Sequence, residues 1–512
     1  MAARRLVGVA ALAVAAVTLR PAGAREQTPP PRTHVVVVVD GLRPDYVTPT
    51  RMPRLTRLGE RGIVFRAHHS VYPTVTRVNA ATFATGVYAE GHGLLGNAVY
   101  VPAVSATKTL DTGSRANLEA IANADGRLLT APSLGEILPK AGRRILAIGA
   151  GTSGAAFLLN HTVGTGAIVH PEFTRPADLG PRVLEALGPA PPQAMPNDAQ
   201  NRYAADAYLK LGLEQLHPDL TLMWISDPDH TAHSSGIGSD LTTRALTLAD
   251  AEIGRLEDAL RTKGLLDRTN FIVVSDHGFT THTGTFRLPA LVEPFTSRMP
   301  DGSPDIVVAE GAIYLRGGTD PARVAKIVAA LQQRPEVGAI FTRPRAGGGA
   351  EGAVPGTLSF DVVRWNHPRA GDILVSADWT DDTNEAGYAG TTGQTGVAGH
   401  GATSPYDIHN VLIAAGPDFR SHATSDAPTG NADLAPTLLR LLGLPVPAGM
   451  TGRVIDEAFE DGPAPSSLRI ERTSESVRSP DGGYELTAHF SAVAGHRYLD
   501  DTVVRRRKER EP

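Results

Sequence analysis

Aspartate and histidine residues recur at the ends of apolar runs, and their spacing is typical of a metal site. In "DPDHTAH", Asp229 and His233 are four residues apart, so one helical turn can place both side chains on the same face. In "SDHG", Asp276 and His277 follow an apolar run, at a point where we expect the chain to turn. His400 lies in "AGHGATSPYD", where the flanking glycines allow the backbone to approach a ligand closely.

Asp40 ends the run "THVVVVVDG" and completes a set of carboxylate and imidazole groups. The chain has no cysteine, so no thiolate can join the set. This chemistry suits zinc, with manganese or iron as alternatives. The groups are too many for one tetrahedral zinc with an open position, and they fit two ions, which lie roughly 3.5–4 Å apart in two-metal sites. Each residue alone has a structural alternative, a helix cap or a buried hydrogen bond, so the prediction rests on the set as a whole.

A pair of threonines opens another segment of interest, "VYPTVTRVNAATFATG". Thr74 and Thr76 precede a run of small residues that predicts a helix. Threonine at a helix start commonly caps it. Thr76 is therefore either a cap or a nucleophile, and the segment alone leaves both readings open.

Alternating strands and helices predict the architecture that must position these residues. Apolar, β-branched runs indicate buried strands at 33–41, 143–151, 219–227, 269–278 and 409–417. Helical patterns at 201–216 and 241–264 precede two of them, and a third at 431–445 ends in Gly and Pro. We predict an α/β fold with a doubly wound, mostly parallel sheet, whose ligands lie beyond the carboxyl ends of the strands.

The alternation of predicted strands and helices is interrupted between residues 279 and 399. We interpret residues 33–278 and 400–460 as the catalytic core, and 279–399 as an inserted, smaller α+β lobe that caps it. Residues 461–512 form a polar C-terminal tail, for which we expect a short hairpin followed by disorder.

The N-terminus has the order of a Sec-type signal peptide over residues 1–24. Two arginines precede an apolar run from Leu6 to Leu19, and "AGA" follows. The run is shorter than the roughly 20 residues that span a bilayer, although a retained anchor is the alternative. We expect a bacterial periplasmic or secreted protein with no membrane span after cleavage. The formal net charge of -5 indicates no nucleic-acid-binding surface.

Five separated motifs, in order, resemble those of the nucleotide pyrophosphatase/phosphodiesterase family, within the alkaline phosphatase superfamily. The resemblance extends from about His34 to Phe459 and is carried by "VVVVVDGLRPDY", "YPTVTRVNAATFATGVYAEGHGLLGN", "DPDHTAH", "SDHG" and "AGHG". It implies an alkaline phosphatase-like fold and metal-dependent hydrolysis of phosphoric esters.

The resemblance also implies a role for each position. One zinc would be held by Asp229, His233 and His400, and the other by Asp40, Asp276 and His277, with Thr76 bridging to the second. Thr76 would be the nucleophile and form a phospho-threonine intermediate. Asn97 would bind a phosphoryl oxygen, and the helix start at Thr76 would favour the phosphate.

Asn97 bears on the substrate, because a neutral amide suits a phosphodiester or pyrophosphate better than a more highly charged monoester. The first hypothesis is an exported, zinc-dependent phosphodiesterase or nucleotide pyrophosphatase acting on a small phosphodiester or a nucleotide. A phosphomonoesterase or phosphonate (C–P) hydrolase on the same two-zinc scaffold is the alternative, and a non-catalytic binding homologue is a minor one. The absence of cysteine argues against a formylglycine sulfatase.

Two positions depart from nucleotide-hydrolysing relatives, and both concern substrate binding. Arg77 stands where an aromatic residue often helps to sandwich the base, and Trp224 stands where Tyr is common. Trp224 could stack on a base. Arg77 could stack, bind a second anionic group, or simply be a solvated residue at a helix start.

Overall fold

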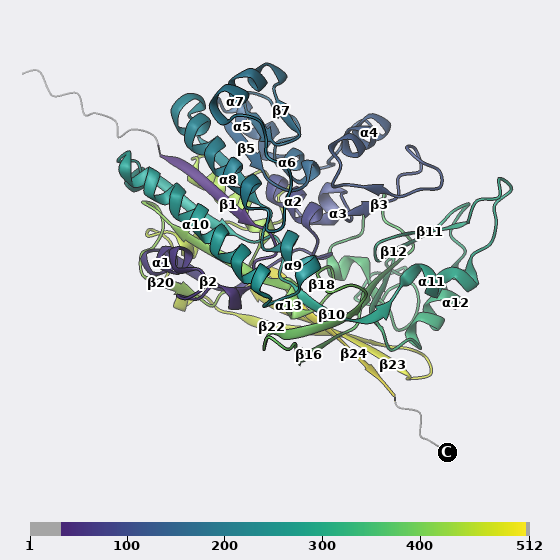
Figure 1. Cartoon of the computed structure of the whole chain (residues 1–512). Coiled ribbons are helices and arrows are strands. Elements are labelled where there is room, and N and C mark those ends of the chain that lie inside the picture. Colours follow the sequence, from purple (N-terminus) through teal and green to yellow (C-terminus); the bar gives the residue numbers. More distant parts are fainter. Residues whose placement is uncertain (1–31, 508–512) are drawn as a thin grey trace, which may run out of the picture. The chain divides into compact units, whose positions relative to one another are not determined.

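The computed structural model describes residues 32–507, and a mixed ten-stranded sheet lies at the centre of this region (Figure 1). The predicted signal peptide, residues 1–24, lies outside the described residues. The strand order is β20-β2-β19-β9-β1-β8-β5-β6-β7, and β21 pairs with β2. The strands are β1 (Thr33–Val39), β2 (Ile63–His69), β5 (Ile145–Gly149), β6 (Ala167–His170), β7 (Phe173–Arg175), β8 (Leu220–Ile225), β9 (Thr269–Val274), β19 (His409–Ala415), β20 (Ala423–Ser425) and β21 (Thr429–Gly430).

The predicted α/β architecture is confirmed, and all five predicted strands lie in this sheet. β9, β1, β8, β5 and β6 run parallel, and β19 runs antiparallel to both of its neighbours, β9 and β2. The valines of β1 are at most 1% exposed and serve two cores. Val36 and Val38 face one core, whereas Val35, Val37 and Val39 face the other. This explains why the strand is a continuous apolar run.

Helices cover both faces of the sheet (Figure 1). The core of Val35, Val37 and Val39 includes residues of α1 (Pro53–Arg61), α7 (Gly180–Leu187), α8 (Asp198–Ala207), α9 (Asp229–Ser235) and α10 (Asp240–Thr262). The core of Val36 and Val38 includes residues of α2 (Thr76–Thr85), α4 (Arg115–Asp125), α5 (Leu134–Lys140), α6 (Ser153–Leu159) and α14 (Leu434–Leu441). No helix within residues 32–507 combines the length and apolar character needed to cross a membrane.

The segment 279–399 contains two further sheets. One has the order β11-β12-β15-β13-β14, and the other β16-β17-β10-β18. Their strands are β10 (Thr280–Phe286), β11 (Ile306–Ala309), β12 (Ala312–Leu315), β13 (Val337–Thr342), β14 (Leu358–Ser359), β15 (Ile373–Ala377), β16 (Trp379–Thr383), β17 (Ala389–Gln394) and β18 (Ala398–Gly399). The segment also holds a helix, α12 (Pro321–Gln332). Its first strand, β10, pairs antiparallel with its last, β18, so the segment leaves and re-enters the core at one place.

The C-terminal segment differs from the expected hairpin and disorder. Its described part forms a three-stranded antiparallel sheet of β22 (Glu471–Arg478), β23 (Tyr484–Val493) and β24 (His496–Arg506). Apolar residues alternate along β23, and Tyr484, Leu486, Ala488 and Phe490 are buried in the same core as β12, β13 and β15. The composition of the segment is polar because its other face is exposed, and this concealed the period-2 pattern of a half-buried strand.

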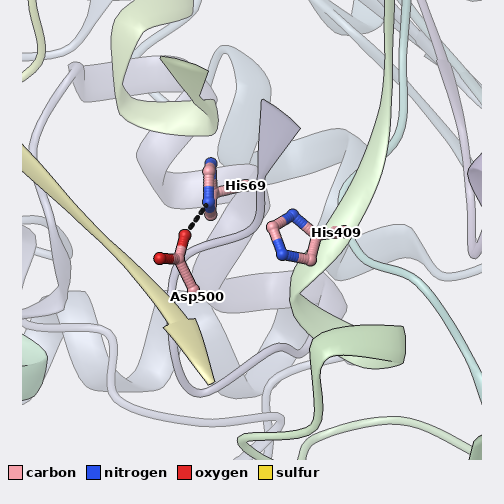
Figure 2. A group of neighbouring side chains, drawn as sticks. All are labelled: His69, His409 and Asp500. Carbon is pink, nitrogen blue, oxygen red and sulfur yellow. Dashed lines mark hydrogen bonds and ion pairs between the residues drawn. The ribbon is translucent and has the colours of Figure 1, made fainter. Parts of the chain in front are cut away.

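A bulge in β24 directs Asp500 toward the central sheet. The register with β23 steps from His489–Asp501 to Phe490–Leu499 and so skips Asp500. The Asp500 carboxylate lies 2.8 Å from His69 Nε2, and His409 packs beside the His69 ring (Figure 2). His69 Nδ1 lies 2.8 Å from the Thr429 carbonyl oxygen. Since both partners are acceptors, both ring nitrogens must carry a proton for both contacts to be hydrogen bonds.

We expect Asp500→Asn to lower the free energy of unfolding by about 1–3 kcal/mol at pH 7, because it removes a charge-assisted hydrogen bond to a buried partner. Burial opposes ionisation, but His69 holds the pKa of Asp500 below its ordinary value. The folded-state pKa is thus below the unfolded one, about 3.9, so the contribution is complete above that pH and fades as pH falls through the folded value. Urea unfolding of both proteins between pH 3 and 7 measures the difference.

Asp501→Asn is the matched control, since Asp501 pairs with His489, whose side chain is 44% exposed. We expect this variant to change stability by less than about 0.5 kcal/mol. Equal effects of the two substitutions would contradict the role assigned to the Asp500 contact.

Candidate metal centre

Three neighbouring parallel strands deliver the acidic residues to one place. Asp40 follows β1, Asp229 begins α9 shortly after β8, and Asp276 follows β9. β8 and β9 flank β1 on its two sides, in parallel. The carboxyl ends of the three strands therefore meet at the same edge of the sheet, where α/β folds bind ligands.

The first group of candidate ligands is Asp229, His233 and His400. Asp229 and His233 lie one turn apart on α9, and His233 Nε2 is 3.2 Å from Asp229 Oδ1. His400 Nε2 reaches the same oxygen at 3.3 Å. One ligand atom from each residue lies within 4.8 Å of the others, so the three atoms can share one cation.

The second group is Asp40, Asp276 and His277. His277 Nε2 lies 3.1 Å from Asp276 Oδ2 and 3.5 Å from Asp40 Oδ1. Asp276 and His277 are fully buried, and Asp40 is 6% exposed. Adjacent residues can act together here because the chain leaves the sheet after β9 and turns.

The pairing of β10 with β18 brings the two groups together. These strands directly follow His277–Phe279 and directly precede His400. The rings of His277 and His400 stack with centroids 3.5 Å apart. The inserted segment thus fixes two ligands that are far apart in the sequence.

Backbone carbonyls orient all three histidines in the same way. The Nδ1 atom of His233 donates to the Ala398 carbonyl oxygen. His277 Nδ1 donates to the carbonyl oxygen of Gly278, and His400 Nδ1 donates to that of Thr74. In a neutral ring this leaves the lone pair on Nε2, which faces the carboxylates. Burial lowers the pKa of His400 to about 4, so this ring is neutral at neutral pH.

The carboxylates have unpaired oxygens and repel one another, and a bound cation would relieve both. Buried oxygens without a hydrogen-bond partner include Asp40 Oδ1, Asp229 Oδ1 and Asp276 Oδ2. Burial and the neighbouring charges of Asp229 and Asp276 raise the pKa of Asp40 well above its ordinary value. An unpaired buried acceptor and mutual repulsion both cost free energy. The residues therefore fit divalent cations that accept imidazole and carboxylate ligands.

Thr76 is the first residue of α2, and its side chain faces the second group. Its Oγ1 is 3.3 Å from His277 Nε2, and the residue is 4% exposed. The extended N-cap residue is Val75, one position before Thr76, so Thr76 is not the cap of this helix. Thr74 binds the His400 loop instead, because its Oγ1 donates to the Ala402 carbonyl. Neither threonine is therefore explained as a helix cap.

Asn97 lies beside the start of α2. Its Oδ1 accepts from the backbone N–H of Arg77 at 3.0 Å, which identifies Nδ2 as the free end of the amide. Within residues 32–507, no hydrogen bond uses Nδ2, and Asn97 lines a cavity next to His233 and His400. The Arg77 side chain is 14% exposed, and its Nη2 is 3.9 Å from Asp111 Oδ1.

Trp224 does not lie where a base could stack on it. The ring is 1% exposed and packs edge-on against Phe83 in the core. Trp224 belongs to β8, and its side chain points beneath the sheet edge, where Nε1 donates to Asp40 Oδ2 at 2.9 Å. Its position supports a different interaction from the expected one, the orientation of a candidate metal ligand.

A cavity of about 460 Å³ adjoins the candidate ligands. Asn97, His233 and His400 form one side, and Tyr72, Leu95, Phe286, Leu288 and Leu374 supply an apolar wall. Glu310 and His282 also line it, although nothing in the sequence singled them out. Both come from the inserted segment, whose strands carry no local motif, so only the tertiary structure places them at the site.

The chain is similar in sequence to known proteins. The profile of the family described as type I phosphodiesterase / nucleotide pyrophosphatase matches residues 34–397. A venom phosphodiesterase of Naja atra is 26% identical over 248 residues, which are 48% of this chain and 26% of that protein. Human ectonucleotide pyrophosphatase/phosphodiesterase family member 1 is 25% identical over 257 residues, which are 49% of this chain and 24% of that protein. The matched region is thus about a quarter of the length of either relative.

Solved structures show a similar fold. Murine ectonucleotide pyrophosphatase/phosphodiesterase 5 superposes with a TM-score of 0.58 and 19% identity, over 81% of this chain and 96% of that one. An inactive form of the murine protein in complex with AMP gives a TM-score of 0.56 over 82% of this chain and 96% of that one. Because the family profile spans well over half of the residues, the chain belongs to the type I phosphodiesterase / nucleotide pyrophosphatase family.

Proposed function

We propose that the protein is an exported, zinc-dependent hydrolase of phosphodiester or pyrophosphate bonds that acts through Thr76. The observation that carries the proposal is a set of three carboxylates, each with a buried oxygen that has no hydrogen-bond partner within residues 32–507, beside a buried threonine hydroxyl. Asp229, His233 and His400 would hold one ion, and Asp40, Asp276 and His277 the other. When bound, the two ions lower the pKa of hydroxyl groups and water and neutralise phosphoryl oxygens.

The chain's own groups supply the nucleophile and the phosphate contacts. Thr76 Oγ1 would attack phosphorus, and the bond from phosphorus to the leaving oxygen would break. Water would then hydrolyse the phospho-threonine and restore the hydroxyl. The N–H groups in the first turn of α2 and the Nδ2 group of Asn97 would face the phosphoryl oxygens, where they stabilise negative charge.

The cavity favours a diester or pyrophosphate over a monoester. A diester carries a second ester group, and the apolar wall beside Asn97 has room to bury one. Arg77, beside the nucleophile, supports binding of a further anionic group such as a second phosphate, although Asp111 already lies near it. The AMP complex of the murine structure supports a nucleotide as one substrate class. A monoesterase or a phosphonate hydrolase on the same centre is the second candidate, because the same cations would serve it.

Export is the remaining part of the proposal. Residues 1–24 have the order of a Sec-type signal peptide. The names of the relatives refer to venom and to ectonucleotide substrates. Zinc is preferred to manganese or iron because half of the six ligands are imidazoles.

We expect Thr76→Ala to lower kcat on a nitrophenyl phosphodiester by at least about 10³-fold, because it removes the nucleophile. Thr76→Ser retains a hydroxyl on the same helix start and should restore activity to within about tenfold. The metal content of both variants, measured by mass spectrometry, should equal that of the wild type. Near wild-type turnover by the alanine variant would exclude Thr76 as the nucleophile.

We expect two zinc ions per chain in the purified wild type, and about one in His233→Ala. Chelation should abolish hydrolysis, and added zinc should restore it. His230→Ala is the matched control: His230 lies on the same helix but contacts Gln193 rather than the candidate ligands. Fewer than one zinc per chain, with no hydrolysis after zinc addition, would instead indicate a non-catalytic homologue.

A panel of substrates distinguishes a phosphodiesterase from a monoesterase or phosphonate hydrolase. On the zinc-loaded protein, we expect a higher kcat/KM for a nitrophenyl phosphodiester than for the nitrophenyl monoester or phosphonoacetate, because the cavity accommodates the second ester group. The ratio should exceed about tenfold, equivalent to about 1.4 kcal/mol. A preference for the monoester or the phosphonate would overturn the diesterase proposal.

A further inference from the structure

A tight hairpin of the inserted segment reaches into the candidate site. β11 and β12 are antiparallel and pair Ala309 with Ala312, so Glu310 and Gly311 form a two-residue turn. Glu310 has φ 52, a left-handed conformation. Asn and Gly are the residues that such turns favour, and a longer side chain is strained there. The sequence therefore places glutamate where the turn itself would favour another residue.

The Glu310 side chain contacts the loop that carries Asn97. Its Oε2 accepts a hydrogen bond from the backbone N–H of Asn97 at 2.9 Å. The approach requires glycine at position 96, because a Cβ there would lie 2.8 Å from Glu310 Oε2 and 2.8 Å from the Ala98 carbonyl oxygen. The contact between Glu310 and Asn97 thus depends on glutamate in the inserted segment and on Gly96 in the core.

The remaining polar groups of Asn97 are fixed by the core. Its carbonyl oxygen accepts from Thr112 N and Thr112 Oγ1, both at 2.8 Å. Its Oδ1 accepts from Arg77 N, one residue after the proposed nucleophile. Among contacts within residues 32–507, Nδ2 is left for a ligand, and the backbone N–H donates to Glu310.

We propose that Glu310 is a positioning residue, through which the inserted segment holds Asn97 at the distance from Thr76 that phosphoryl binding requires. The proposal rests on the proposed function, in which Asn97 Nδ2 contacts the phosphoryl group. A small displacement of a group that binds the reacting centre lowers the rate, because the group is then no longer held in the aligned position before the substrate binds. A hydrogen bond that fixes the Asn97 backbone has this effect without touching the substrate.

The alternative role for Glu310 is direct contact with the leaving group, because the residue also lines the cavity. A direct contact would depend on the negative charge and on which alcohol or nucleoside the substrate carries. A positioning contact depends only on an acceptor oxygen at Asn97 N–H, and its loss should affect all substrates equally.

Three variants of the full-length, zinc-loaded protein distinguish these roles. Glu310→Asn suits the left-handed turn but is too short to reach Asn97, and should lower kcat/KM by about tenfold or more. Glu310→Gln keeps an acceptor oxygen without the charge, and should stay within about threefold of wild type. Glu293→Gln removes an exposed carboxylate elsewhere in the segment and should change nothing. Melting temperatures of all three verify that they are folded.

The loss in Glu310→Asn should be the same for a bis-nitrophenyl phosphodiester and for a nitrophenyl ester of a nucleotide. It should also vanish in an Asn97→Ala background, because a residue that acts through Asn97 has nothing left to position. Equal losses in the Gln and Asn variants, a loss confined to one leaving group, or additive losses with Asn97→Ala would each overturn the proposal.

Calorimetric titration with inorganic phosphate separates this proposal from the proposed function. Phosphate carries no leaving group, and we expect Glu310→Asn to weaken its binding about tenfold while Glu310→Gln does not. If the wild type hydrolyses no diester but shows this pattern, the proposed function fails and the positioning role stands. If the wild type hydrolyses diesters and Glu310→Asn binds phosphate normally, the positioning role fails alone.

Discussion

The mutual repulsion of three closely placed carboxylates, two of them buried, is the constraint on which the rest of the site depends. β8, β1 and β9 are adjacent and parallel, so Asp229, Asp40 and Asp276 must emerge at the same edge of the sheet. Each has one buried oxygen, shielded from water, that has no hydrogen-bond partner within residues 32–507. Such an arrangement is costly unless cations occupy it. The fold therefore creates a demand for positive charge that the chain itself leaves unmet at those oxygens.

The inserted segment completes the centre as well as covering it. β10 and β18 pair immediately beside His277 and His400, and this pairing stacks the two rings. The C-terminal sheet then buries one face in the same apolar core as the insertion. Asp500 ties that sheet to His69 of β2, and Tyr498 ties it to Asp433, just before α14. The inserted segment therefore contacts both the C-terminal sheet and the candidate metal ligands.

Sequence reasoning was most successful where one local pattern determines the position. A continuous apolar run must be a strand buried on both faces, so the residues at its carboxyl end, such as Asp40 and Asp276, could be assigned to one edge of a sheet. The i, i+4 spacing of Asp229 and His233 similarly determined their shared helix face. The structure brings together all six residues of the predicted ligand set and Thr76. Trp224 was misjudged because the alternation of a strand does not reveal which face opens to a cavity.

Contacts that depend on segments far apart in sequence could not be predicted in the same way. Nothing in "VVAEGAIYL" indicates that Glu310 meets the backbone of Asn97, because the meeting depends on how two sheets of the insertion pack on the core. The division of the site between the core and the insertion affects substrate specificity. The core supplies most of the candidate metal ligands and Thr76, whereas the insertion supplies much of the cavity wall and the Glu310 contact to the Asn97 backbone. Substitutions in the cavity wall that the insertion supplies, such as at Phe286, can therefore change which ester group fits without disturbing the three carboxylates.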